Sequence, residues 1–564
     1  IAGLIKKRLP NFALTGIMDV ERGAMAGVMT RQLFIRRARR IALNIQRILL
    51  GEKAEDLSIS IARDERLVIN MATARSIGVY PNWSILTEAE LISTDREVVQ
   101  RELTLFKAVR EAITVNPELA ASSHALTAGS QDIITARANL LPQLEISALG
   151  TFIDDDRAES SFGAQAEQSV SATGSLTQII FSEPVWANLA IQGKFQKARE
   201  YQHKQLRLDI ILNTATAYLD VLRTKTFEFI QRENLNLTRS NLELARIRQN
   251  IGISNPAEVY RWENRIASNR KAVIDANTRR NLAEIALNTI LSRPIEEHFT
   301  TADIHYDDPN LYIGDYKNMG ALDNPWSFRN FRDFMVEKAL ADSPELAALD
   351  ASIEANNRRH SSSKMTYWLP SIALKAELTN NFYKGGAGSD FELDPSLPFP
   401  ISQADDTDWS IGIKASLPIF SGGSRYAATR KISTELKELE KTRRFVTDII
   451  EQRIRSALHL MGASYAGIKQ SRDAAEAARK SLEMIVDAYT RGEASILDLI
   501  DAQNAALVSD QLAANTIYDF IIDYLNVERA VGSFDFLMPD DMREEHLQKM
   551  KEYFKQANMK LGNP

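Results

Sequence analysis

The stretch YTRGEASILDLIDAQ, residues 489–503, predicts two helices joined by a tight turn. Gly492 can adopt the positive φ that ends the first helix, and Ser495 is a suitable N-cap for the second. Asp498 and Asp501 are three residues apart, so they share one face of that second helix. Two acids are therefore expected side by side near the end of a helical hairpin.

The composition of the 564 residues is typical of folded protein, with 25% charged and 44% hydrophobic residues. A net charge of −6 argues against a nucleic-acid-binding protein, which is usually basic. The absence of cysteine excludes disulfides, thiolate metal sites and cysteine nucleophiles. The sequence contains no apolar run of about 18 residues, so no transmembrane helix is predicted. Because the chain begins at Ile1 rather than Met, we expect a processed or partial product.

An internal duplication organises most of the chain. Pro117 and Pro344 are 227 residues apart, Phe181 and Phe420 are 239 apart, and Gly252 and Gly492 are 240 apart. This period is far too long for a solenoid repeat. The paired segments occur in the same order: VNPEL and DSPEL, NLLPQLEISA and YWLPSIALKA, SLTQIIFSEP and SLPIFSGG, RQNIGISNPAEVY and TRGEASILDLI.

Each half contains two segments in which apolar and polar residues alternate. The segments are 144–152 and 170–180 in the first half, and 372–379 and 409–419 in the second. Period-two alternation predicts strands, either in the hairpins of a soluble sheet or as tilted membrane strands of about 9–11 residues. Four strands cannot close a barrel, since about eight is the minimum. Membrane strands would therefore require several chains to share one barrel.

Long helices are predicted after each pair of strands. Residues 183–251 and 422–491 contain no proline beyond the first turn and are rich in good helix formers. Each segment would be about 100 Å long. Shorter helices return after the glycine turns, near 257–291 and 495–531. A cytoplasmic coiled coil also has such lengths, but the strands next to each long helix argue against it.

Residues 94–537 resemble the TolC-like family of outer-membrane efflux proteins. The resemblance rests on the duplicated plan, on NPEL, LPQL, SLTQIIFSEP and SLPIFSGG, and most on YTRGEASILDLIDAQNAAL continuing to YLNVERAVG. It implies a mainly α fold with membrane β: a homotrimer with long periplasmic helices, in which each chain gives four strands to a shared 12-stranded barrel in outer-membrane lipid. Residues 292–332 would form an equatorial belt, and 384–408 and 154–168 external loops. Residues 94–330 and 331–539 would be the two repeats.

The resemblance also assigns roles to the residues of the opening stretch. Asp498 and Asp501 match acids that form charged rings at the periplasmic entrance, and acidic rings attract cations. Tyr489 and Glu258 match residues whose contacts hold that entrance shut. An alternative for the acids is that one caps or pairs within the hairpin end while the other is only solvated.

One departure from the family affects the entrance contacts. The family archetype has an arginine two residues after the hairpin glycine, where this chain has Ala494, so a contact made by arginine at that position is not expected. Arg491 is the candidate substitute. The hairpin ends themselves should face a periplasmic adaptor protein, through Gly252, Asn255, Gly492 and Glu493.

The two ends of the chain differ from this plan. Residues 1–93 resemble the C-terminal part of an ABC-transporter-type periplasmic substrate-binding protein, through RRIALNIQRILLG, LVINMATARSIGV and LTEAELI. This partial α/β segment is expected to have a strand, a short helix and a loop in 65–83, and a basic helix ending at Gly51. Its cluster at 36–40 fits a solvated helix face better than a contact with anionic lipid or nucleic acid. Residues 540–564 form a charged C-terminal tail, expected as a loose terminal helix.

These features predict an outer-membrane exit duct that works passively with a periplasmic adaptor and an inner-membrane pump of RND or ABC type. A duct for type I polypeptide secretion shares the fold. The alternative from another class is a periplasmic solute-binding module on a coiled-coil scaffold. We nominate no catalytic residue, cofactor, metal site or nucleic-acid partner, because the seven histidines are scattered and no nucleotide-binding or hydrolase motif occurs. The acids at 154–156 could bind a divalent ion but fit an acidic loop better.

Overall fold

The computed structural model describes residues 2–13, 17–29, 45, 48, 53, 66–82, 85–86, 89–92, 102–161, 163–250, 252, 254–313, 325–389 and 405–560. The chain divides into two compact units. One contains residues 1–117, 208–335 and 454–564, and the other contains 118–207 and 336–453. Each unit draws on both predicted repeats, so the repeat boundaries at 94, 331 and 540 stay a prediction. None of the described helices is long and apolar enough to span a membrane.

The N-terminal segment forms a small sheet with the strand order β1-β2-β3-β4. Its strands are β1 (Phe12–Ala13), β2 (Ala26–Met29), β3 (Arg66–Asn70) and β4 (Glu90–Ile92). Helix α4 (Met71–Ile77) follows β3 directly, and α1 (Ala2–Lys6) and α2 (Ile17–Glu21) precede β2. The side chain of Asn70 caps α4 by accepting from the Thr73 amide at 3.1 Å. The predicted strand and short helix are confirmed, whereas the predicted basic helix with its cluster at 36–40 lies outside the described residues.

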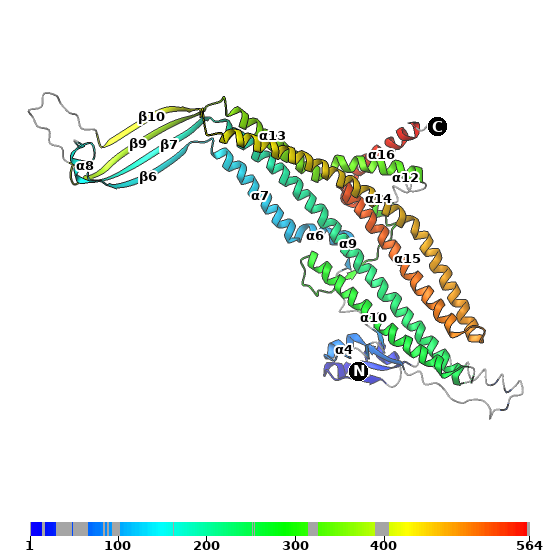
Figure 1. Ribbon diagram of the computed structural model, residues 1–564. Helices are drawn as coiled ribbons and strands as arrows, with labels where there is room; N and C mark the ends of the chain where they lie inside the picture. Colours follow the sequence, from blue (N-terminus) through cyan, green and yellow to red (C-terminus); the bar gives the residue numbers. More distant parts are fainter. Residues whose placement is uncertain are drawn as a thin grey trace, which may run out of the picture. The chain divides into compact units, whose positions relative to one another are not determined.

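The four long strands form one antiparallel sheet in the second unit (Figure 1). They are β6 (Gln143–Phe152), β7 (Gln168–Phe181), β9 (Ser371–Gly385) and β10 (Thr407–Ser416). The order β10-β9-β7-β6 joins the strands of both repeats through the β7–β9 pair. Strands β6 and β10 are consequently the two edges of the sheet.

The register sorts the side chains of this sheet onto two faces. On one face Ile413 lies opposite Leu374 of β9, and Ile411 lies opposite Ala376. On the other face Ser410 lies opposite Glu377, which in turn lies opposite Ser175 of β7. Ile413 is 70% exposed, so none of the described residues covers this part of the apolar face. The predicted alternation is confirmed, and the sheet is amphipathic.

Strand β10 ends earlier than the alternating pattern predicts. The pattern runs to Ile419, but β10 stops at Ser416. The reason is Pro418, which has no amide hydrogen to donate to a neighbouring strand. At the other end of the sheet, β9 extends into the predicted external loop as far as Gly385, and the short helix α8 (Asp155–Glu159) occupies the other predicted loop.

Long helical hairpins account for most of the remaining chain. Helix α9 (Glu183–Asn250) and α10 (Pro256–Ile290) form one pair, and α14 (Ser424–Arg491) and α15 (Ile496–Val531) form the other (Figure 1). Helices α9 and α14 each contain 68 residues, as the sequence predicts. Shorter helices, α6 (Leu105–Val115), α7 (Pro117–Ala138), α12 (Pro325–Asp342) and α13 (Pro344–Met365), complete the set. Pro117 and Pro344 each begin a helix, where proline is favoured.

The segment predicted as an equatorial belt has short elements in its described residues 292–313, and α12 begins near its end at Pro325. Strand β8 (Thr300–Thr301) pairs in parallel with β5 (Glu102–Leu103), and a 3-10 turn, η2, covers Pro309–Leu311. The buried hydroxyl of Tyr218 on α9 lies 2.8 Å from the carbonyl oxygen of Leu103 and 2.7 Å from that of Ala302. Burial raises the pKa of Tyr218, so this phenol stays protonated and ties the short strands to α9.

The C-terminal tail is a packed helix rather than a loose one. After a 3-10 turn, η3 (Asp535–Leu537), helix α16 covers Asp540–Lys560. The ring of His546 stacks on Phe334 of α12 at 5.7 Å, and the Met550 side chain is fully buried. The guanidinium of Arg543 lies 3.8 Å above the Tyr312 ring. Sequence analysis recognised the charge of this tail but missed the apolar and aromatic residues on its inner face.

Candidate functional site at the hairpin ends

Two glycine turns connect the long helices. Gly252 has φ 77° between α9 and α10, and Gly492 has φ 81° between α14 and α15. Both values lie in the left-handed region that glycine adopts without strain. The side chain of Asn255 accepts from the Ala257 amide at 3.0 Å and so caps α10. The predicted turn at Gly492 is confirmed.

Ser495 and Asp498 cap the start of α15 reciprocally. The Ser495 hydroxyl accepts from the Asp498 amide at 3.3 Å, and the Ser495 amide donates to the Asp498 carboxylate at 2.9 Å. The Ser495 hydroxyl also donates to that carboxylate at 2.7 Å. These hydrogen bonds lower the pKa of Asp498, so the carboxylate is ionised at neutral pH. The Ser495 cap is confirmed, and Asp498 makes the capping contact that the alternative assigned to one of the acids.

Asp501 lies one turn further along the same helix face. Its side chain is exposed, like that of Asp498, and it makes no hydrogen bond to the described part of the chain. Leu499, between the two acids, is fully buried on the opposite side. The cap uses lone pairs of Asp498 without covering the carboxylate, so both acids remain available to solvent and ions.

A buried apolar cluster joins the ends of all four long helices. Leu499 and Ile496 of α15 pack in one cluster with residues of α9, α10 and α14. The buried members are Ala245, Val259, Trp262, Tyr489, Ile496 and Leu499. Because α9–α10 and α14–α15 share this cluster, the two hairpin ends form one packed site within the first unit.

Tyr489 is the polar centre of this cluster. Its hydroxyl donates to the Glu258 carboxylate at 2.8 Å, so the structure brings together the two predicted entrance residues. Burial, followed by this hydrogen bond, raises the pKa of Tyr489 from 10.0 to about 12. A raised pKa in the folded state means that the contact stabilises fully below pH 10 and weakens as the pH approaches 12. The contact therefore persists at all physiological pH values.

The arginine that reaches Tyr489 is not the one that the sequence suggested. Arg491 pairs with Glu493 at 3.0 Å on the exposed turn and makes no contact with Glu258. Arg248, in the last turn of α9, is buried, donates to the Tyr489 carbonyl oxygen, and places its guanidinium 4.5 Å from the centre of the Tyr489 ring. Sequence analysis missed Arg248. Its position four residues before Gly252 was a usable signal, since a basic residue in a last turn complements the helix carbonyls.

Replacing Arg248 with methionine should loosen the hairpin ends. The Tyr489 carbonyl would lose its buried donor, at a cost of about 1–3 kcal/mol. We expect hydrogen–deuterium exchange of residues 485–500 to accelerate about tenfold or more. Arg491→Met is the matched control, because that arginine is exposed and should leave the exchange unchanged. Equal exchange in the two variants would contradict the role of Arg248.

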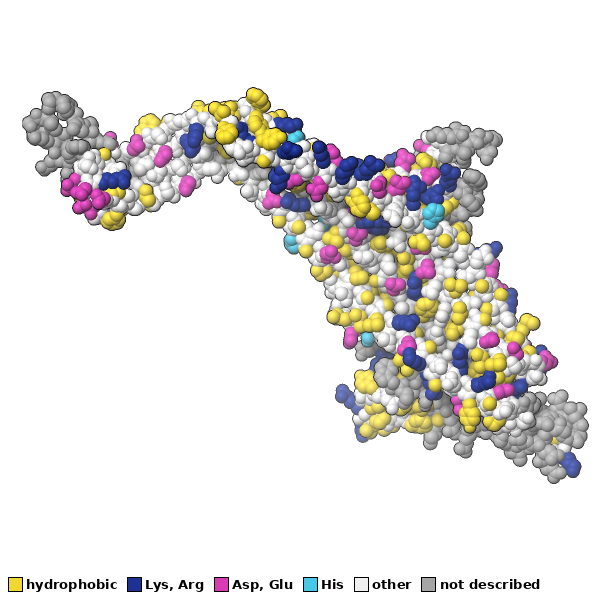
Figure 2. Space-filling view, in the orientation of Figure 1, with side chains coloured by type: hydrophobic (Ala, Val, Ile, Leu, Met, Phe, Trp, Pro, Cys, Tyr) yellow, Lys and Arg dark blue, Asp and Glu magenta, His cyan; other side chains and the backbone are white. Residues whose placement is uncertain are grey.

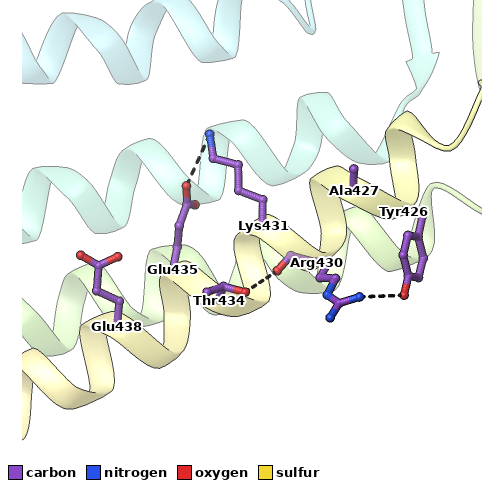
Figure 3. Close-up of a pocket in the computed structure, with 7 residues that line it drawn as sticks. All are labelled: Tyr426, Ala427, Arg430, Lys431, Thr434, Glu435 and Glu438. Atoms are coloured by element: carbon purple, nitrogen blue, oxygen red, sulfur yellow. Dashed lines mark hydrogen bonds and ion pairs between the residues drawn. The ribbon is translucent and has the colours of Figure 1, made fainter.

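Other polar groups on the described surface do not form a comparable site. A groove follows one face of α14 from Tyr426 to Glu438 (Figure 3). Two of its charged side chains, Lys431 and Glu435, pair with each other along the helix at 3.6 Å. Asp154, Asp155 and Asp156 are the one group of three or more acidic or histidine side chains, among the described residues, close enough to hold a metal ion. All three are exposed, and the Asp154 side chain caps the short helix α8. Figure 2 shows acidic side chains gathered at this end of the sheet.

The arrangement of duplicated strands and paired long helices matches a known family. The family of outer membrane efflux proteins matches residues 108–293 and 335–533. The chain belongs to this family. Outer membrane protein TolC of Escherichia coli (strain K12) is 26% identical over 449 residues, which cover 76% of this chain and 82% of that protein. Outer membrane efflux protein BepC of Brucella suis biovar 1 is 23% identical, with coverage of 73% and 81%.

Solved structures of outer-membrane proteins have the same fold. CusC superimposes with a TM-score of 0.62 at 14% identity, covering 76% of this chain and 92% of its own. VceC of Vibrio cholerae has a TM-score of 0.61 at 17% identity, with coverage of 76% and 96%. The TolC-like fold class, mainly helical with a β contribution, is confirmed.

Membership of the outer membrane efflux proteins also confirms the predicted function and location. The chain is an outer-membrane exit duct of an efflux or secretion system, with a long periplasmic helical part. The family match begins at residue 108, so the resemblance of residues 1–93 to a substrate-binding protein stays a prediction.

Proposed function

We propose that three copies of this chain form one continuous duct through the outer membrane and into the periplasm. Each copy contributes β6, β7, β9 and β10 to a shared 12-stranded barrel, with the Ile413 face toward lipid and the Glu377 face toward the lumen. The observation that carries this proposal is the sheet itself. It has one exposed apolar face, and its edge strands β6 and β10 each lack a second partner strand in the described part of the chain. In a bilayer both edges must be paired.

The long helices support the same assembly. The part of α14 near the sheet exposes Tyr426 and Phe445, at 65% and 64%, along the side that carries the groove. Exposed aromatic residues on a long helix fit packing against a neighbouring helix. In the trimer this surface of α14 packs against another copy, and the helices enclose a periplasmic tunnel.

The hairpin ends form the periplasmic entrance of the duct. Asp498 and Asp501 of three copies line it with two acidic rings, and the Tyr489–Glu258 contact, supported by Arg248, holds it shut. The turns at Gly252 and Gly492 face a periplasmic adaptor, which connects the duct to an inner-membrane pump of RND or ABC type. The duct itself is passive and carries out no catalysis or cofactor chemistry, since the energy comes from the pump.

Cysteine crosslinking tests this topology. The native chain contains no cysteine, so Asn255→Cys and Glu493→Cys introduce unique thiols at the hairpin turns. We expect both to crosslink to the adaptor in the periplasm and to resist impermeant thiol reagents added to intact cells. Asp155→Cys, on the predicted external loop, is the matched control and should be labelled from outside. Outside labelling of Asn255→Cys and Glu493→Cys would refute the orientation.

A further inference from the structure

Five polar side chains are buried together beneath the apolar cluster of the hairpin ends. They come from three helices, α9, α10 and α15, and all five residues belong to the first unit. Their exposed fractions are 7% for Asn234, 0% for Thr238, 3% for Asn241, 6% for Asn269 and 2% for Gln503. Polar groups in so dry an environment are stable only when they are hydrogen-bonded.

Gln503 is the contribution of α15 to this polar layer. Its amide nitrogen donates to the Asn234 side-chain oxygen and to the Thr238 hydroxyl, both at 2.7 Å. Its amide oxygen accepts from the Asn241 side chain at 3.2 Å. One side chain of α15 is therefore bonded to three consecutive turns of α9.

Thr238 links the third helix to the layer. Its hydroxyl donates to the Asn234 carbonyl oxygen at 2.8 Å and accepts from the Asn269 side chain of α10 at 2.7 Å. This hydroxyl on α9 also accepts from the Gln503 amide of α15, so its hydrogen bonds connect all three helices. A rotation or slip of α15 against α9 would break several of these bonds at once, without water to replace them.

The layer lies on the side of α15 opposite the acid pair. Leu499, Gln503 and Ala506 are buried, whereas Asp498, Asp501 and Ala505 are exposed. Apolar contacts alone tolerate small rotations, because they have no direction. Hydrogen bonds do not, and a polar group in an apolar core is known to specify helix register.

We propose that Gln503 is a positioning residue that sets the rotation of α15 and thereby aims Asp498 and Asp501. The inference rests on the proposed function for the part that concerns the entrance. The new element is that a buried amide, two residues after Asp501 in the sequence, determines which way the two acids point. This amide does not itself contact ions or cargo.

Thiol reactivity measures the rotation of α15 without reference to transport. Ala505 is exposed and Ala506 is buried, so Ala505→Cys and Ala506→Cys report on opposite sides of one helix. In the assembled full-length protein with native Gln503, Ala505→Cys should react about 100 times faster than Ala506→Cys. In the Gln503→Leu background this ratio should fall about tenfold, as expected when buried partners lose a hydrogen bond.

Two further variants keep the test decisive. Gln511→Leu, on the same helix and half-buried, should leave the ratio unchanged. Thr238→Val removes the central hydroxyl with little change of shape and should also lower the ratio. It therefore tests the inference even if Gln503→Leu fails to assemble. An unchanged ratio in both Gln503→Leu and Thr238→Val would overturn the inference.

Channel recordings separate this inference from the proposed function. Gln503→Leu should weaken the block of single channels by a trivalent cation added from the periplasmic side, although both acids are still present. A lowered thiol ratio with unchanged block would support the positioning role and count against an acidic entrance. An unchanged ratio would refute the positioning role, whatever the block shows.

Discussion

Replacing Ile413 with arginine should abolish assembly of the trimer in the outer membrane. Ile413 lies near the middle of β10 on the exposed apolar face of the sheet. An arginine that faces lipid near the bilayer midplane costs about 2–4 kcal/mol. Three copies per barrel triple this cost, which is then comparable to the free energy of unfolding of an ordinary folded domain. The measurement is the yield of heat- or SDS-resistant trimer in purified outer membranes.

Ser410 provides a control on the same strand. Its side chain lies on the opposite, polar face, directly across from Glu377 of β9. Ser410→Arg should therefore assemble, because its charge would face the water-filled lumen beside a carboxylate. Normal trimer yield from Ile413→Arg would show that β10 does not face lipid. Equal loss in both variants would show that any arginine disrupts the strand.

Replacing both Asp498 and Asp501 with alanine should remove cation selectivity at the entrance and abolish most of the block by trivalent cations. Three chains would place six carboxylates around one constriction. Like charges this close repel one another, and the hydrogen bonds from Ser495 lower the pKa of Asp498. The cap thus helps to keep the ring ionised and attractive to cations. Single-channel current in a planar bilayer, with the cation titrated on each side in turn, measures the effect.

The capping role of Asp498 requires its own control. Ser495→Ala removes the hydroxyl that accepts from the Asp498 amide and donates to its carboxylate, but keeps both acids. It should cost about 1 kcal/mol of local helix stability and retain the sided block. Asp501→Asn keeps the cap and should reduce the block by itself. If the double-alanine channel keeps native selectivity and block, the two acids do not line the entrance.

Local patterns were sufficient to predict the elements of this fold. Gly492 acts through its own backbone and the Ser495 side chain bonds only three residues away, so the turn and the cap could be predicted from neighbouring residues. The alternation in β10 likewise predicted which face is apolar, but not the strand end at Ser416, where Pro418 overrides the pattern.

The missed residues act through distant partners. Arg248 contacts Tyr489 across 241 residues of sequence, and Asn241 contacts Gln503 across 262. A glutamine in a helix is ordinary by every local rule, so only the packing of α15 against α9 shows that Gln503 is buried and bonded. Tyr489 and Glu258 were selected by resemblance to a family, and the structure shows their contact, whereas the gating role stays a prediction.

The unpaired edges of β6 and β10 determine how the duct can be made. A single chain that entered the bilayer would expose two rows of backbone amides and carbonyls to hydrocarbon, each costing several kcal/mol. A single chain should therefore not insert stably until two other chains can pair with its edges. Membrane insertion and association of the three chains are then expected to occur in the same step. The rate of biogenesis should then rise more steeply than linearly with the concentration of exported chains. Until the chains associate, the same open edges can pair with other chains, which favours aggregation.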